Sequence, residues 1–214
     1  RKRRRGTRSG ASRDAQLLTG RNCNHNGSAQ TLFQAHDFHV LFYNIQGLLG
    51  HVAELTAAIR LSMKKPSLVC LNETFLDESV EDVPLEGYDI VARRDRCDGR
   101  KGGGVAVYAI TSISSRVVTI EKSSSSGRAW MVLHSDTGPY LIGVWYRPPV
   151  PGEMQSIMDF SEEWQRLSKE VLGTILVGDL NVHHIRWLRY SLRNSAEGEL
   201  LRDICDAVGL RQLV

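Results

Sequence analysis

Residues 174–184, T-I-L-V-G-D-L-N-V-H-H, form an apolar run that ends abruptly in polar groups. The apolar part, residues 175–177, predicts a short buried strand between two glycines. Residues two apart on an extended backbone project to the same side, so we expect Asp179 and Asn181 to project together at the strand end. The sequence Gly-Asp-x-Asn is also ordinary turn chemistry that closes a strand. This stretch alone therefore leaves a catalytic role and a structural role open.

Two earlier apolar segments end in the same way. Residues 38–45, F-H-V-L-F-Y-N-I, predict the first strand, which carries Asn44 near its end. Residues 68–71 predict a second strand, and Glu73 follows shortly after it. Between the two strands, apolar residues at spacings of three and four predict an amphipathic helix that Pro66 prevents from continuing. The ends of three strands therefore present polar side chains of the kind found in catalytic sites.

The middle of the chain predicts short strands with little helix between them, at 88–92, 105–110, 117–120, 130–134 and 140–146. The last one ends at Tyr146, and Arg147 and two prolines then force the chain out of the sheet. A tyrosine at such a place is more often a packing residue than a chemical one. Two more amphipathic helices are predicted, one near residues 157–171 and one that Ser195 caps and Gly209 closes.

Two loops in this region have possible phosphate-binding character. Gly102, Gly103 and Gly104 form a joint, but no Gly-Lys-Ser/Thr follows and the next element is a strand, so a P-loop is not indicated. The basic residues between 93 and 101 could contact phosphates, although a solvated basic face explains them equally well.

Length and composition indicate one globular domain. The chain has 214 residues, of which 42% are hydrophobic and 24% are charged. It has no apolar run near the roughly 20 residues of a membrane span and no secretory h-region, so we expect no membrane partner and a nuclear or cytoplasmic location. Its four cysteines form no C-x-x-C pair, which argues against a zinc ribbon and favours reduced thiols.

The positive charge is concentrated at the start of the sequence. Residues 1–30 hold eight of the 27 basic residues and one of the 24 acidic residues, so the remainder has 19 basic and 23 acidic residues. This segment has almost no apolar residues and predicts a disordered basic leader over residues 1–35. Its R-K-R-R-R run is typical of a nucleic-acid arm or a nuclear-localisation signal, and a merely solvated basic end is the alternative.

The polar strand ends meet the requirements of phosphodiester hydrolysis. That reaction needs a cation on the scissile phosphate, an activated water and donors for the added negative charge. Glu73 is a suitable oxygen ligand for Mg²⁺, and Asp179 can accept a proton from water. Asn181 can orient that carboxylate or donate to phosphate, and the phenol of Tyr146 can donate to a phosphate oxygen.

The order of F-Y-N-I-Q-G-L, C-L-N-E-T, G-G-G-V-A-V-Y, V-W-Y-R-P-P and V-G-D-L-N-V-H-H-x-x-W resembles the endonuclease/exonuclease/phosphatase superfamily. In particular, it resembles the apurinic-type endonuclease domain of non-LTR retrotransposons, over about residues 38–214. The resemblance implies that Asn44 is a metal-site or phosphate-contacting asparagine and that Glu73 binds the metal. It implies that Tyr146 is an active-site tyrosine, that Asp179 activates water, and that Asn181 is the asparagine that accompanies this aspartate.

Some positions carry weaker or missing implications. Pro149 departs from the Tyr-x-Pro-Asn version of the motif, so no asparagine role carries over there. His183 and His184 match the retrotransposon branch and are expected in structural or substrate-contacting roles, and Arg147 is a candidate for substrate binding. The family's terminal aspartate and Ser-Asp-His motif have no match, so the chain is expected to be a domain cut short after residue 214.

The resemblance implies an α/β fold, a four-layer sandwich of two mainly antiparallel sheets flanked by helices, over residues 36–214. The expected function is an Mg²⁺-dependent endonuclease, with Mn²⁺ as a possible substitute, that nicks DNA for a reverse transcriptase of the same polyprotein. One alternative keeps the fold and changes the substrate to a phosphoinositide, sphingomyelin or RNA tail. The other is an inactive remnant that only binds nucleic acid.

Overall fold

The structure is a computed structural model that describes residues 38–96, 102–123, 125 and 127–213. The predicted basic leader and the basic residues Arg100 and Lys101 lie outside the described residues. Two of the four cysteines are described, and both Cys70 and Cys205 are buried free thiols. Burial raises the pKa of Cys70 to about 12, so this thiol is protonated at neutral pH.

The first sheet has four strands in the order β1-β2-β4-β3. Their bounds are Val40–Asn44 for β1, Leu68–Asn72 for β2, Tyr88–Arg94 for β3 and Val105–Ile110 for β4. β1 and β2 are parallel, and the other pairs are antiparallel. A parallel pair needs a crossover, which helix α1 provides over Leu48–Leu61.

The second sheet repeats this plan in the order β5-β6-β7-β8. Its strands are β5 Val117–Lys122, β6 Arg128–Ser135, β7 Gly138–Tyr146 and β8 Gly173–Asp179. β7 and β8 are parallel, and helix α2, Gln155–Leu167, lies between them in the sequence. Helix α3, Ala196–Ala207, follows β8, and two short 3-10 turns are η2, Ser114–Arg116, and η3, Ser168–Glu170.

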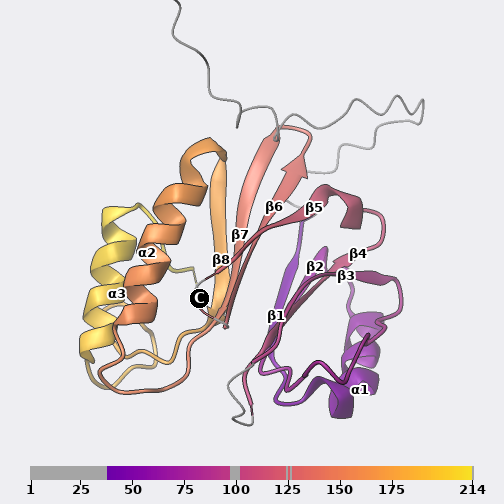
Figure 1. The fold of residues 1–214 in the computed structure, drawn as a ribbon, viewed down its shortest axis with the longest axis horizontal. Helices are drawn as coiled ribbons and strands as arrows, with labels where there is room; N and C mark the ends of the chain where they lie inside the picture. Colours follow the sequence, from indigo (N-terminus) through magenta and orange to yellow (C-terminus); the bar gives the residue numbers. More distant parts are fainter. Residues whose placement is uncertain (1–37, 97–101, 124, 126, 214) are drawn as a thin grey trace, which may run out of the picture. The chain divides into compact units, whose positions relative to one another are not determined.

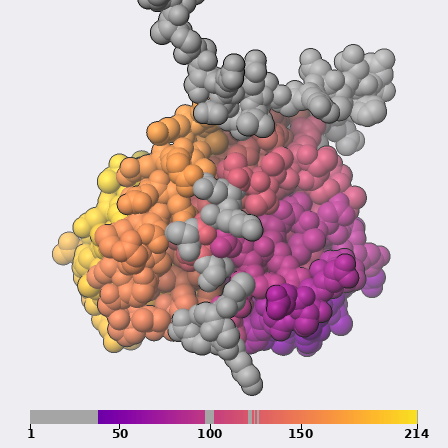
Figure 2. Space-filling model, viewed as in Figure 1, coloured from indigo at the N-terminus to yellow at the C-terminus, as the bar shows by residue number. Residues whose placement is uncertain are grey.

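The two sheets pack face to face, and helices cover their outer sides (Figure 1). The central core combines residues of both sheets, such as Cys70 and Val107 with Met131 and Val144. A second cluster lies between the first sheet and α1, and a third lies between the second sheet and helices α2 and α3. In Figure 2 the α2 and α3 side, in orange and yellow, lies opposite the indigo and magenta first sheet. The expected four-layer sandwich with mainly antiparallel sheets is confirmed.

The predicted elements are found with small shifts at their ends. Helix α1 begins at Leu48, earlier than its apolar spacing indicates, because Gly47 adopts a φ of 111° and turns the chain directly into the helix. Ser195 caps α3 as predicted, since its side chain accepts a hydrogen bond from the backbone N–H of Gly198 at 3.1 Å. None of the helices in the described part of the chain is both long and apolar enough to cross a membrane.

Candidate active site

Three of the sequence-predicted residues are joined directly by hydrogen bonds. Asn44 ends β1, Glu73 directly follows β2, and Asp179 ends β8. The Asn44 Nδ2 atom donates to Glu73 Oε1 at 2.7 Å and to Asp179 Oδ2 at 3.1 Å. One carboxamide of the first sheet therefore bridges a carboxylate of its own sheet and a carboxylate of the other sheet.

Tyr146 lies next to the same two carboxylates. It ends β7, and its backbone pairs with Asp179 in the parallel ladder between β7 and β8. Burial raises the pKa of the Tyr146 phenol, and the charges of Glu73 and Asp179 and a hydrogen bond with Glu73 raise it further. The phenol is therefore protonated at neutral pH and can act as a hydrogen-bond donor.

The residues at this point fit a hard divalent cation. Two carboxylates lie beside one amide, and the buried Oδ1 atom of Asn44 has no hydrogen-bond partner among the described residues. Mg²⁺ usually binds through one or two carboxylates and keeps several waters. Within the described ranges, no group of three or more His, Cys, Asp or Glu side chains is arranged to hold a metal ion, so the ligands available at this point are the two carboxylates and the Asn44 amide oxygen.

The backbone at two of these positions is strained. Glu73 has a φ of 54° and Asn181 has a φ of 47°, both in the left-handed region that L residues other than glycine rarely adopt. Strain of this kind persists only where surrounding contacts impose it, and it is common in active sites. It also corrects the expectation of an extended backbone through Asn181: β8 ends at Asp179, and Asn181 turns away.

Asn181 contacts Asp179 through its backbone. Its N–H donates to Asp179 Oδ1 at 3.3 Å, while its side-chain Nδ2 donates to the carbonyl of Arg147 at 2.9 Å. The side chains of Asp179 and Asn181, which the sequence predicts to project together, therefore have different partners: Asp179 accepts from Asn44, and Asn181 donates to the Arg147 carbonyl.

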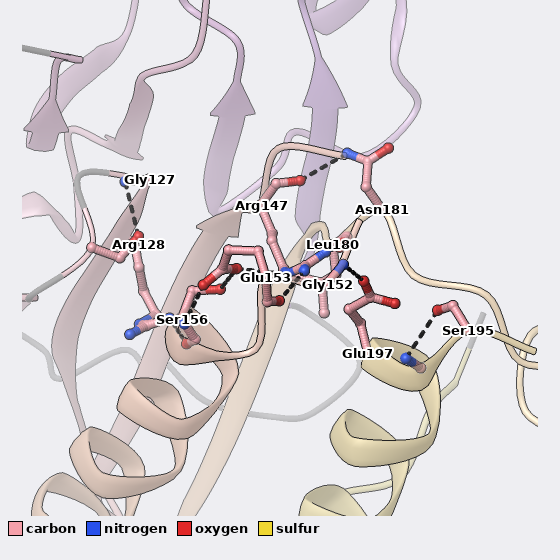
Figure 3. Close-up of polar contacts among 12 residues, drawn as sticks. Gly127, Arg128, Arg147, Gly152, Glu153, Ser156, Leu180, Asn181, Ser195 and Glu197 are labelled. Atoms are coloured by element: carbon pink, nitrogen blue, oxygen red, sulfur yellow. Dashed lines mark hydrogen bonds and ion pairs between the residues drawn. The ribbon is translucent and has the colours of Figure 1, made fainter. Parts of the chain in front are cut away.

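Arg147 is buried, with 1% of its surface exposed. Its guanidinium donates to the carbonyls of Leu180, at 3.4 Å, and Glu153, and its Nε lies 3.3 Å from the Glu153 carboxylate (Figure 3). Its backbone N–H also donates to the carbonyl of Asp179 at 2.9 Å. The guanidinium is directed into the protein, where it ties the end of β7 to the turn that carries Asp179.

Two carboxylates at helix starts support this arrangement. Burial alone would raise the pKa of Glu153, but hydrogen bonds from Ser156 and the charge of Arg147 lower it. Glu197, in the first turn of α3, accepts a hydrogen bond from the backbone of Gly152, as Figure 3 shows. Backbone hydrogen bonds are the main cause that lowers the pKa of Glu197. Helices α2 and α3 are thereby fixed to the loop that follows Tyr146.

The two adjacent histidines point apart, as expected for consecutive residues. His184 is buried, and its Nε2 lies 3.2 Å from Glu199 and 3.3 Å from Arg202 on α3. This position favours the structural role for His184 over contact with a substrate. The His183 side chain is exposed. The backbone of His183 forms hydrogen bonds with Ser195.

The sequence did not single out Asn72 or Gly178 as site residues. Asn72 is fully buried, and its Nδ2 donates to the carbonyl of Trp145 in the other sheet at 3.1 Å. A side chain on Gly178 would place its Cβ 1.9 Å from the same carbonyl, so only glycine fits there. Asn72 precedes Glu73 and Gly178 precedes Asp179, both of which were predicted as site residues. The sequence does not reveal that Asn72 and Gly178 lie against the Trp145 carbonyl on β7.

A pocket of about 340 Å³ opens beside Tyr146. Its lining includes Arg96, from the basic segment before the glycine joint, and Gln155 and Asp159 of α2. Arg93 of the same basic segment is used structurally, because it binds Asp95 at 2.7 Å and the carbonyls of Val80 and Asp77.

Comparison with known proteins supports one family. The sequence profile of the Endonuclease/Exonuclease/phosphatase family matches residues 41–200. Comparison with curated protein sequences gave no match. The endonuclease domain of TRAS1, a telomere-specific non-LTR retrotransposon, has a similar fold, with a TM-score of 0.58 and 13% identity over 82% of this chain and 74% of that one.

Two other solved structures share the fold. An AP endonuclease from Archaeoglobus fulgidus gives a TM-score of 0.56 with 13% identity, over 79% of this chain and 70% of that one. The 3'-5' exonuclease NExo from Neisseria meningitidis gives 0.56 with 13% identity, over 78% and 70%. Since the family profile spans most of the sequence and the two-sheet sandwich is the one these nucleases share, the chain belongs to the endonuclease/exonuclease/phosphatase family, a family of phosphoester hydrolases.

Proposed function

We propose that this chain is a DNA-nicking endonuclease domain of the non-LTR retrotransposon type, which hydrolyses phosphodiesters with Mg²⁺, or with Mn²⁺ in its place. The observation that carries the proposal is the Asn44 carboxamide, which holds the carboxylates of Glu73 and Asp179 together across two sheets. Two carboxylates, an amide and a neutral phenol supply an acceptor for the proton of water and hydrogen-bond donors for the phosphate, which are two of the requirements of phosphodiester hydrolysis.

Each residue has one role in the proposed reaction. Glu73 and Asn44 would hold the ion, which supplies positive charge near the scissile phosphate when bound. Asp179 accepts the proton of the water that attacks phosphorus, while the ester bond on the opposite side breaks and the leaving 3′ oxygen takes a proton from solvent water. When substrate binds, Tyr146 turns its phenol hydrogen from Glu73 to a phosphate oxygen, and the backbone N–H of Asn181 keeps the Asp179 carboxylate in place.

DNA as the substrate is supported by the basic leader and by the similarity of the fold to DNA-acting nucleases. A nick with a free 3′ hydroxyl would prime a reverse transcriptase, which is the partner that a retrotransposon polyprotein implies.

The test is nicking of supercoiled plasmid in Mg²⁺, with EDTA as the blank. Removing one group of a preorganised electrostatic site costs about 10²- to 10³-fold in rate, so Glu73→Gln and Asp179→Asn should each lose at least that much. Glu54→Gln, an exposed position on α1, is the matched control. Nicking that survives EDTA and both substitutions would contradict the proposal, and DNA binding without nicking would support the inactive-remnant alternative.

A second candidate is a phosphatase or exonuclease that acts on DNA 3′ ends. The Neisseria 3' phosphatase NExo, solved with a product DNA hairpin, matches this fold nearly as well as the TRAS1 domain does, with a TM-score of 0.55. A 3′-phosphorylated oligonucleotide separates the two candidates. Release of inorganic phosphate without plasmid nicking would favour the end-directed activity.

A further inference from the structure

The segment between β8 and α3 forms a closed loop, which we call the arginine loop, residues 185–194. Its ends are joined, because the Ser195 N–H donates to the carbonyl of His183 at 2.8 Å and the His183 N–H donates to Ser195 Oγ at 3.2 Å. Inside these contacts, the Ile185 N–H donates to Asn194 Oδ1 at 2.8 Å. The base of the loop is therefore fixed, so the loop presents its outer side chains from a defined position.

The loop has an inner side and an outer side. Trp187 and Leu188 pack against the core between the second sheet and the helices. Tyr190 and Leu192 are instead 85% and 95% exposed, and Ile185 is 56% exposed. Single exposed apolar residues are common on protein surfaces, and what distinguishes this loop is that three of them fall within eight residues.

The same loop carries only positive charge. Residues 183–195 contain three arginines, Arg186, Arg189 and Arg193, and no acidic residue. All three are exposed, and within the described ranges none of them forms an ion pair. Glu199 of α3, which faces the base of the loop, binds His184 and Asn194 instead.

The loop also lies close to the candidate active site along the chain. His183, at its base, follows Asp179 by four residues, and α3 begins at the end of the sandwich where β8 ends (Figure 1). A duplex whose phosphate reaches Asp179 extends well beyond that phosphate in both directions, so the neighbouring surface must meet its flanking backbone and grooves.

We propose that the arginine loop is a contact surface for duplex DNA that flanks the scissile phosphate. Its arginines contact backbone phosphates, and Tyr190 and Leu192 lie against bases and sugars in a groove. Arginine is the charged residue best suited to phosphate, and exposed side chains such as Tyr190, with the Arg189 guanidinium 5.6 Å from its ring centre, can pack in a groove or wedge between base steps. The inference rests on the proposed function and deepens it, because it assigns the element that positions the duplex.

The test is binding of a short fluorescein-labelled DNA duplex, followed by anisotropy in EDTA at several salt concentrations. Two loop variants are compared with wild type: Arg186→Gln/Arg189→Gln/Arg193→Gln and Tyr190→Ala/Leu192→Ala. The controls are Arg60→Gln/Arg116→Gln/Arg211→Gln, which removes the same charge elsewhere, and Leu61→Ala/Met63→Ala, which removes exposed apolar groups at and just after the end of α1.

The arginine variant should lower the slope of log affinity against log salt by about 1 for each phosphate that the loop no longer neutralises. The Tyr190 and Leu192 variant should weaken binding by about 10-fold with an unchanged slope, because it removes apolar contacts and no charge. Equal effects in loop and control variants would overturn the inference, as would a loop effect seen with an RNA duplex of the same sequence and absent with DNA. Because these measurements need no metal, a wild-type chain that binds through the loop but fails to nick plasmid would contradict only the proposed function.

Discussion

At the residue scale, the candidate site depends on amides and guanidinium groups that hold acidic side chains in place. The side-chain amide of Asn44 donates to Glu73 and Asp179, so both of its hydrogen bonds stay within the site. Arg147 acts one layer further out, through the carbonyls and carboxylate that surround the Asp179 turn. The places of Asn44, Glu73 and Asp179 at or just after strand ends could be predicted from the apolar runs that precede them. The inward direction of Arg147 could not, because its partners Glu153 and Leu180 come from other segments.

We therefore predict that Arg147 positions Asp179 and Asn181 and does not bind substrate. Lysine keeps the charge but lacks the planar fork that reaches several acceptors at once, so Arg147→Lys should misplace Asp179 and Asn181. A misplaced catalytic group of this kind can cost about 10²-fold in rate. We expect kcat for plasmid nicking to fall by that order while KM stays within a few-fold.

The split between kcat and KM decides this prediction. A raised KM with an unchanged kcat would show that Arg147 binds the phosphate directly. Arg166→Lys, in the last turn of helix α2, is the matched control and should leave both constants unchanged.

At the element scale, polar groups buried under α2 join that helix to the second sheet. The carboxylate of Glu163 accepts hydrogen bonds from Arg128 at 2.8 Å, Trp130 at 2.7 Å and Ser123 at 2.8 Å. The guanidinium of Arg128 also lies 4.6 Å from the centre of the Trp145 ring. The spacing of apolar residues predicts helix α2 correctly and indicates that the helix packs on the core. It does not indicate the buried ion pair between Arg128 and Glu163.

Burial alone would raise the pKa of Glu163, but its hydrogen bonds with Arg128, Trp130 and Ser123 and the charge of Arg128 lower it to about 2. A folded-state pKa below the unfolded value means that the stabilisation is present above pH 4.5 and is lost as the pH falls from 4.5 towards 2. We expect acid to reduce the free energy of unfolding by about 3 kcal/mol through this group.

Urea unfolding of the wild type and Glu163→Gln across that pH range measures the effect. The variant should be less stable at neutral pH and should lose less stability as the pH falls. Glu162→Gln, the neighbouring position on the helix, serves as the control. Parallel pH profiles for wild type and Glu163→Gln would show that other carboxylates govern acid unfolding.

At the scale of the whole molecule, the parallel strand pairs explain why the site forms where it does. Each sheet contains one parallel pair, and the carboxyl ends of both pairs supply the site residues, as the Asn44–Asp179 contact shows. The sequence predicts every strand, since buried strands are continuous apolar runs. It does not predict that the two sheets meet through Asn72 and Trp145, because such a contact depends on tertiary packing.

Charge distribution at this scale separates two contributions to DNA affinity. Residues 31–214 contain 19 basic and 23 acidic residues, so this part of the chain repels a polyanion overall. Residues 1–30, with eight basic residues and one acidic residue, carry the opposite charge. Long-range attraction should therefore come from residues 1–30, while a local contact such as the arginine loop acts only at short range.

Deleting residues 1–30 should flatten the salt dependence of duplex binding, because each phosphate contact releases counterions and contributes about 0.9 to the slope of log affinity against log salt. Anisotropy of the labelled duplex across a salt series measures that slope. A variant that keeps the length of the segment but has glutamine at its eight basic positions separates charge from chain length, and it should behave like the deletion. If both variants retain the wild-type slope, the phosphate contacts are made by residues 31–214. These residues would then contain a basic surface that makes more phosphate contacts than the arginine loop does, despite their net negative charge.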